Sequence, residues 1–200
     1  MDNNEDCPKD VPFDHHDLVE ARHRFSELAF RGERWDLSHL DAFALRLDPG
    51  LGFEIDVVIL FSCHCFTHSL KRDPRRMTEI PQDELFVTDQ ETRVLSDERY
   101  KLSRQYLHDM MTSLPKRDIR IAGTEKQNFM TFTALAPGKA GTTYTVFFEV
   151  LRDRKRAKRI VVRVQSAYAV PLLTRRQQKA QKVRGLTLLR AAYEGRGIRS

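Results

Sequence analysis

The chain has 200 residues, of which 40% are hydrophobic and 31% charged, values near the norm for globular domains. It contains no run of about 18 consecutive apolar residues, which excludes a membrane-spanning helix. The net charge of +6 is unevenly distributed: residues 152–200 carry 15 Lys/Arg and two Asp/Glu, whereas residues 1–151 carry 19 and 26. So dense a basic segment favours a polyanionic partner such as nucleic acid.

Cysteine usage and the N-terminal sequence bear on location and domain organisation. Three cysteines, an odd number, argue for reduced thiols and against a disulfide framework. The N-terminus is acidic and lacks the order of a signal peptide, so we expect a cytoplasmic protein that does not bind membranes. We expect one domain over residues 13–173, preceded by a flexible acidic arm at 1–12 and followed by a basic C-terminal helix at 174–200.

The first half of the chain predicts a helix, a hairpin and a loop. Apolar residues recur at helical spacing from Asp14, a candidate N-cap, to Gly32, a candidate stop. Alternating apolar residues at 43–48 and 53–61 flank the turn sequence DPGLG and predict a long β-hairpin. Prolines and charges at 67–83 then predict a long surface loop.

The second half predicts one more helix and a series of strands. The helix should begin after Ser96, its N-cap, and end before Pro115. Short strands at 118–123 and 127–135 follow, and then a hairpin over 142–170 that is rich in β-branched and aromatic residues. Hairpins with helices before, between and after them predict an α+β fold around a mainly antiparallel sheet, with no parallel βαβ unit.

The segment FSCHCFTHSLKRDPRR carries two cysteines and two histidines close together and then becomes basic. If the preceding strand continues through Cys65, its period of two places Cys63 and Cys65 inside and His64 outside. One metal ion cannot then take both thiols and His64, and cysteines are often buried in cores. We therefore expect no metal and no cofactor. A metal site would require the chain to leave the β conformation after Phe61, and a catalytic thiol would have to reach solvent.

His64 is the candidate general acid or base, because an outward imidazole beside a basic loop can exchange protons near neutral pH. His68, four residues later, is the second candidate. The segment as a whole is therefore interpreted as the end of a core strand that leads into a basic loop.

Two basic segments are candidates for nucleic-acid binding, because arginine and lysine bind phosphate oxygens. In the loop these residues are Lys71, Arg72, Arg75 and Arg76. In the C-terminal helix they are Arg175, Arg176, Lys179, Lys182 and Arg184. Arg99 and Arg104 of the second helix are expected to pair at the surface with Asp97 and Glu98 instead. The alternative for both basic segments is that they balance acidic groups of the same chain, of a second copy in a homodimer, or of an acidic protein partner.

Two family resemblances bear on function. The last hairpin, YTVFFEVLRDRKRAKRIVVRVQSAY, resembles the closing strands of RelE and ParE type toxins. Tyr144 and Phe148 match the aromatic residues of the first strand, Arg163 the basic residue of the last, and Tyr168 the terminal tyrosine. The resemblance implies a ribosome-dependent RNase with Arg163 and Tyr168 in its site, although QSA stands where many of those enzymes carry His or Arg. Separately, FSCHCFT followed by DERYKLS resembles short uncharacterised bacterial proteins, some of them on phages and plasmids.

These observations lead to three functional expectations. The first is a protein that engages nucleic acid, RNA in preference to DNA, and that cleaves phosphodiesters without a metal if it is an enzyme. His64 or His68 would then transfer the proton, and Arg72, Arg75 or Arg163 would stabilise the phosphorane. The second is a non-catalytic regulatory module whose basic tail binds an acidic protein or itself. The third is a fold stabilised by zinc.

Overall fold

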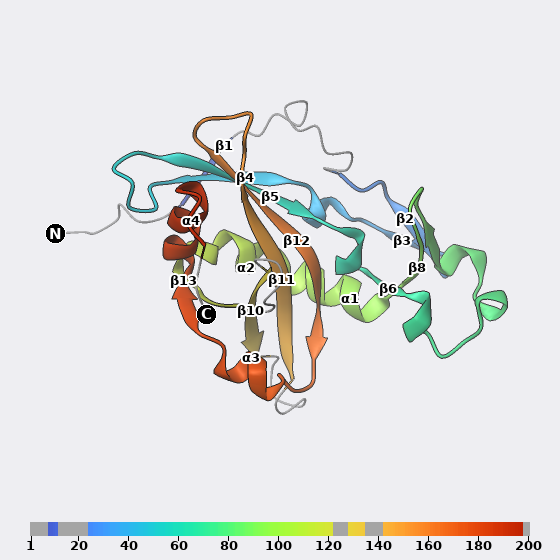
Figure 1. The fold of residues 1–200 in the computed structure, drawn as a ribbon. Coiled ribbons are helices and arrows are strands. Elements are labelled where there is room, and N and C mark those ends of the chain that lie inside the picture. The colour runs from blue at the N-terminus through green and yellow to red at the C-terminus, as the bar shows by residue number, and fades with distance from the viewer. Residues whose placement is uncertain (1–7, 12–23, 122–127, 135–141, 198–200) are drawn as a thin grey trace.

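The computed structural model describes residues 8–11, 24–121, 128–134 and 142–197. A large curved sheet dominates the molecule, and two small sheets lie together at one side of it (Figure 1). In spatial order, the strands of the large sheet are β1 (Lys9–Val11), β4 (Phe43–Leu47), β5 (Ile55–Phe61), β12 (Arg159–Val170), β11 (Thr143–Arg152), β10 (Asn128–Ala134), β9 (Asp118–Ile121) and β13 (Lys182–Arg184).

The remaining elements are short. The small sheets consist of β2 (Leu28–Phe30) with β3 (Glu33–Trp35), and of β6 (Thr67–Ser69), β8 (Thr92–Leu95) and β7 (Leu85–Val87). The α-helices are α1 (Asp97–Leu102), α2 (His108–Thr112), α3 (Arg175–Lys179) and α4 (Gly185–Tyr193), and a π-helical turn, η7 (Ser103–Leu107), joins α1 to α2. The 3-10 turns are η2 (Ser38–Leu40), η3 (Cys63–Cys65), η4 (Leu70–Arg72), η5 (Met77–Glu79), η6 (Gln82–Glu84) and η8 (Leu114–Lys116). Among the described residues, no helix is long and apolar enough to cross a membrane.

One main core lies between the sheet and its helices. The elements α1, η7 and α2 follow one another and form the central helical segment. Its residues Leu107 and Met111 share this core with Ile160, Val162 and Val164 of β12. The other face of the sheet carries a smaller apolar cluster around Val58 and Val161. β12 is therefore buried on both faces, which explains its nearly continuous run of β-branched residues.

Several predictions about secondary structure are confirmed. The fold is mixed, with most strand pairs antiparallel, and the hairpins β4–β5 and β11–β12 lie where the alternating patterns placed them. The central helical segment begins after Ser96, whose side chain accepts a hydrogen bond from the Arg99 amide at 3.4 Å. Strands β9 and β10 also occupy the expected positions.

The N-terminal predictions are partly wrong. Residues 12–23, which include most of the expected first helix, lie outside the described residues, but its C-terminal part is the hairpin β2–β3. Arg31 and Gly32 both have positive φ there, 51° and 78°, as a two-residue hairpin turn requires. Gly32 thus closes a hairpin and does not end a helix. In the arm expected at 1–12, Lys9–Val11 is strand β1, which pairs with β4.

The sheet is mainly antiparallel, as expected, but it contains one parallel pair, β5 with β12, that no sequence pattern indicated. Two other predictions are corrected. The loop expected at 67–83 contains strand β6 and a series of 3-10 turns, ordered by ion pairs described below. The single helix expected at 174–200 is interrupted: α3 is followed by β13, which pairs with β9 as an edge strand, and then by α4, whose Leu188 and Leu189 are buried.

The start of α4 yields a prediction about stability. Gly185 is buried against the end of the central helical segment, where a methyl group would overlap the carbonyl of Leu114, and its amide donates to the carbonyl of Arg117 at 3.0 Å. We expect Gly185→Ala to lower the free energy of unfolding by about 2 kcal/mol or more, because backbone must move to admit the methyl group. Thr187→Ala, at an exposed position of the same helix, should change it by less than about 0.5 kcal/mol. Urea unfolding of both variants measures this, and equal effects would contradict the close approach.

Candidate functional site

The parallel pair brings the end of β5 beside the middle of β12, a strand distant in sequence. β5 and β12 run side by side until Phe61 lies opposite Val164. Beyond that point the Ser62 amide donates to the Val164 carbonyl at 3.1 Å, and the Ser62 hydroxyl to the Gln165 carbonyl at 2.6 Å. The register of β12 against β11 then shifts at a β-bulge. β5 therefore ends here, whereas β12 continues along β11 to Val170.

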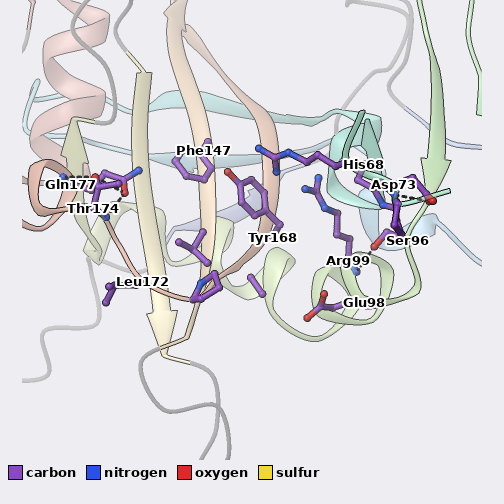
Figure 2. A pocket seen from close by; sticks show the side chains of 15 residues that line it. His68, Asp73, Ser96, Glu98, Arg99, Phe147, Tyr168, Leu172, Thr174 and Gln177 are labelled. Atoms are coloured by element: carbon purple, nitrogen blue, oxygen red, sulfur yellow. Dashed lines mark hydrogen bonds and ion pairs between the residues drawn. The ribbon is translucent and has the colours of Figure 1, made fainter. Parts of the chain in front are cut away.

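An open cleft of about 560 Å³ lies beside the end of β5. Figure 2 shows Tyr168 in the middle of it, with Arg99 and His68 on one side and Thr174 and Gln177 on the other. The lining residues come from β6, the turn after it, α1, β11, β12 and the start of α3. Those that bear polar or charged groups of interest are His68, Arg72, Arg99, Tyr168, Thr174 and Gln177.

Two guanidinium groups lie over the ring of Tyr168 in this cleft. The Arg99 guanidinium carbon is 4.5 Å from the ring centroid, and that of Arg72 is 5.7 Å from it. Within the described part of the chain, neither arginine forms an ion pair; the Arg99 guanidinium donates to the carbonyls of His64 at 2.9 Å and Thr67 at 2.7 Å. Burial, and after it the positive charge of Arg72, lowers the pKa of Arg99 below its ordinary value. Asp73 and Glu98 also line the cleft, and Asp73 is paired with Arg75. An anion that bridges Arg72 and Arg99 would relieve the repulsion between these two guanidinium groups.

An ion-pair network holds the loop that carries Arg72. The carboxylate of Asp73, which is 3% exposed, accepts from the Arg75 guanidinium at 2.9 Å and 3.0 Å. Arg75 also pairs at 2.8 Å with Glu84, which in turn pairs with Arg31 of the β2–β3 turn at 2.9 Å. The hydrogen bonds from Arg75 hold the pKa of Asp73 well below its usual range. The guanidinium of Arg75, a predicted phosphate ligand, is thus engaged in ordering the loop.

The predicted catalytic residues are only partly brought together. His68 and Tyr168 line the cleft, and the His68 Nε2 atom is 3.2 Å from the Asp73 carboxylate. His64 lies in a neighbouring pocket, where its Nε2 atom is 2.9 Å from the Glu91 carboxylate. Arg163 pairs with Glu149 of β11. His64 and Arg163 are therefore not among the residues that line the cleft with Tyr168.

The other predicted cations have different positions. Lys71 and Arg76 are exposed on the loop, where the Arg76 amide donates to Glu79 at 2.8 Å and so caps η5. Arg175 and Lys179 are exposed on α3; Arg176 belongs to that helix, but its side chain lies outside the described part. Lys182 and Arg184 of β13 line a separate basic groove at the sheet edge, together with Lys116, Arg117 and Arg120.

The basic groove also contains Asp118, which pairs with Arg184 at 3.1 Å and with Lys182 at 4.0 Å. α3 connects this groove to the cleft. The Arg120 guanidinium donates to the carbonyls of Gln177 at 3.2 Å and of Ala180 at 3.3 Å, while Gln177 also lines the cleft. The basic groove and the cleft are thus linked through α3, which itself carries the exposed Arg175 and Lys179.

Sequence reasoning missed Arg99 and Arg120 as site residues. Arg99 was expected to be a surface partner of Asp97 and Glu98, but it lies partly buried against Tyr168. No local pattern indicates this, because the contact depends on the distant parallel pairing of β5 and β12.

Comparison with known proteins places the chain in a family. Residues 27–193 match the model of the YjaZ family, so the chain belongs to this family. The matched range includes the cleft, the loop network and the basic groove. No curated protein and no solved structure matches the chain.

The loop network yields a prediction about stability and its pH dependence. Asp73→Asn should lower the free energy of unfolding by about 2 kcal/mol at pH 7, because it removes the charged partner of Arg75 and His68. Since the folded pKa of Asp73 is lowered below its ordinary 3.8, its contribution is present above that pH and is lost as the pH falls. The difference from the native protein should therefore shrink below about pH 4.

The matched control is Asp83→Asn, at an exposed carboxylate of the same loop. Urea unfolding between pH 3 and pH 7 should show little effect of this control. A difference between Asp73→Asn and the native protein that stays constant across this range would contradict the assigned role of Asp73.

Proposed function

We propose that this member of the YjaZ family binds the phosphate backbone of nucleic acid, RNA in preference to DNA, in the cytoplasm. The observation that carries the proposal is the pair of guanidinium groups, Arg72 and Arg99, that share the ring of Tyr168 without an ion-pair partner among the described residues. Two like charges held close together are costly, and the cost is removed when a phosphate bridges them. A guanidinium group suits this role because its N–H groups can bind two phosphate oxygens at once.

The geometry favours backbone binding over base recognition. Arg72 and Arg99 cover a face of the Tyr168 ring, and Phe147 stacks beside it with ring centroids 5.5 Å apart. A base therefore has little aromatic surface on which to stack. Phosphate contacts fix register and orientation but carry little sequence information, so we expect weak sequence preference.

The positive charge beyond the cleft supports a ligand longer than a single phosphate. α3 presents Arg175 and Lys179 to solvent, and the basic groove beyond it adds Lys116, Arg120 and Lys182. Single-stranded nucleic acid can follow such a path, because its backbone places a phosphate at each nucleotide. Binding of this kind releases counterions and should weaken steeply as salt is added.

A catalytic form of this function is favoured by one further contact. The Asp73 carboxylate lies 3.2 Å from the His68 Nε2 atom and can orient the ring, so that His68 can act as general acid or base toward a phosphodiester in the cleft. Arg99 would stabilise the charge that develops on phosphorus. Cleavage of RNA that persists in a chelator and is lost in His68→Ala would support this form, and persistence of cleavage in that variant would exclude it.

Binding is tested by fluorescence anisotropy with a labelled 20-nucleotide single-stranded RNA and with DNA of the same sequence. We expect Arg72→Ala to weaken RNA binding roughly tenfold and to reduce the slope of log affinity against log salt by about one. Arg154→Ala, an equal change of charge at an exposed turn residue of the β11–β12 hairpin, should leave both nearly unchanged.

Two outcomes would contradict the proposal. Equal losses in Arg72→Ala and Arg154→Ala would show that net charge alone drives binding. Absence of salt-dependent RNA binding, together with capture of a defined acidic protein that needs residues 174–200, would favour the non-catalytic interaction module instead.

A further inference from the structure

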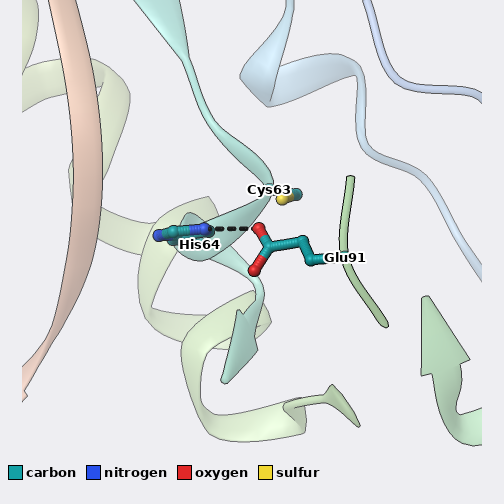
Figure 3. A group of neighbouring side chains, drawn as sticks. All are labelled: Cys63, His64 and Glu91. Carbon is teal, nitrogen blue, oxygen red and sulfur yellow. Dashed lines mark hydrogen bonds and ion pairs between the residues drawn. The ribbon is translucent and has the colours of Figure 1, made fainter. Parts of the chain in front are cut away.

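The turn after β5 brings Cys63 and His64 beside Glu91, from the loop between β7 and β8 (Figure 3). A thiol sulfur, an imidazole nitrogen and a carboxylate oxygen, one from each residue, all lie within 4.8 Å of one another. Zinc takes this combination of sulfur, nitrogen and oxygen donors. We propose that Cys63, His64 and Glu91 form a zinc-binding site, outside the residues that line the phosphate-binding cleft.

The backbone conformation makes this convergence possible. β5 ends at Phe61, and Cys63–Cys65 forms a 3-10 turn. Ser62 caps this turn, its hydroxyl accepting from the His64 amide at 3.2 Å. The prediction that a strand continues through Cys65 is therefore wrong, and the alternation that would separate Cys63 from His64 does not apply. Of the two cysteines in this turn, only Cys65 is fully buried. Burial raises the pKa of its thiol to about 12, and the thiol takes no part in the proposed site.

Small side-chain shifts would bring the three donor atoms, now within 4.8 Å of one another, to the spacing of a tetrahedral site. Zinc bonds of 2.0 to 2.3 Å place neighbouring donor atoms about 3.3 to 3.8 Å apart. The His64 Nε2 and Glu91 Oε1 atoms, now 2.9 Å apart, would need to separate by less than about 1 Å. Their side chains are 37% and 41% exposed, so that an ion can enter from solvent. A water molecule would take the fourth position, in a pocket of about 370 Å³ that Phe25 and Phe61 also line.

Buried groups behind the three residues hold them in place. Thr67, which is fully buried, donates its hydroxyl to the Cys63 carbonyl at 2.7 Å and accepts from Arg93 Nε at 2.7 Å. Arg93 also donates to the Glu91 Oε2 atom at 2.8 Å, which leaves Oε1 directed at His64. Metal-binding carboxylates are commonly oriented by such outer hydrogen bonds. Cys63 and Glu91, distant in sequence, are thus fixed relative to each other through Thr67 and Arg93.

The proposal is tested with cobalt as a spectroscopic probe of the full chain. The protein is treated with a chelator, exchanged into chelator-free buffer and titrated with Co²⁺. We expect one ion per chain, a thiolate-to-cobalt charge-transfer band in the near ultraviolet, and loss of that band when one equivalent of Zn²⁺ displaces the cobalt. Cys63→Ser should abolish the band, and Glu91→Gln should weaken cobalt binding at least tenfold.

Two variants serve as matched controls. Cys65→Ala removes the neighbouring thiol and should retain the band, while Asp89→Asn removes an exposed carboxylate of the same pocket and should leave the affinity unchanged. Circular dichroism verifies that each variant is folded. Absence of the band in the native protein at saturating cobalt, or a band that survives in folded Cys63→Ser, would overturn the proposal. Neither result would bear on RNA binding at the cleft.

Discussion

The parallel contact between β5 and β12 determines where the residues of the cleft and the group of Cys63, His64 and Glu91 lie. It joins the N-terminal hairpin to the C-terminal hairpin in one sheet and buries β12 on both faces. β5 ends at Phe61, where hydrogen bonds from Ser62 to the segment Val164–Gln165 fix its position, while β12 continues along β11 to Val170. Both binding sites that we propose lie beside the end of β5. On one side the last residues of β12 place Tyr168 beside Arg99, and on the other the turn after β5 places Cys63 beside Glu91.

Charge pairing then decides which cations near these sites remain available. Sequence counts suggested a basic tail against an acidic body. In the tail, Lys182 and Arg184 do pair with Asp118 of the body, but the carboxylates near the cleft pair with other cations of the body. Arg75 forms ion pairs with Asp73 and Glu84, and Arg163 forms one with Glu149. Exposed pairs of this kind add little stability, whereas the nearly buried carboxylates of Asp73 and Glu84 fix the loop geometry. Arg72 and Arg99 are candidates for binding an anion, because no described carboxylate forms an ion pair with them and both lie over the ring of Tyr168.

The sequence predicted local structure well and long-range structure poorly, for physical reasons. Alternating apolar residues identified both long hairpins, and Ser96 marked the start of the central helical segment. The hairpin at Arg31–Gly32 was mistaken for a helix end because glycine with positive φ serves both. The parallel pair leaves no local pattern, so neither the approach of Arg72 to Tyr168 nor that of Cys63 to Glu91 could be foreseen. His68 and Tyr168 were predicted from residue chemistry and the toxin resemblance, and the fold places both in one cleft.

Hydrogen–deuterium exchange of the full chain, with and without single-stranded RNA, tests most directly whether the cleft beside the end of β5 binds nucleic acid. Our account predicts that RNA slows exchange in the segments that surround the cleft, namely residues 67–73, 96–100 and 166–178. Exchange in the hairpin turn at 153–158, which is equally rich in basic residues, should be unaffected. Protection of that turn in preference to the cleft segments, or no protection at saturating RNA, would contradict the account.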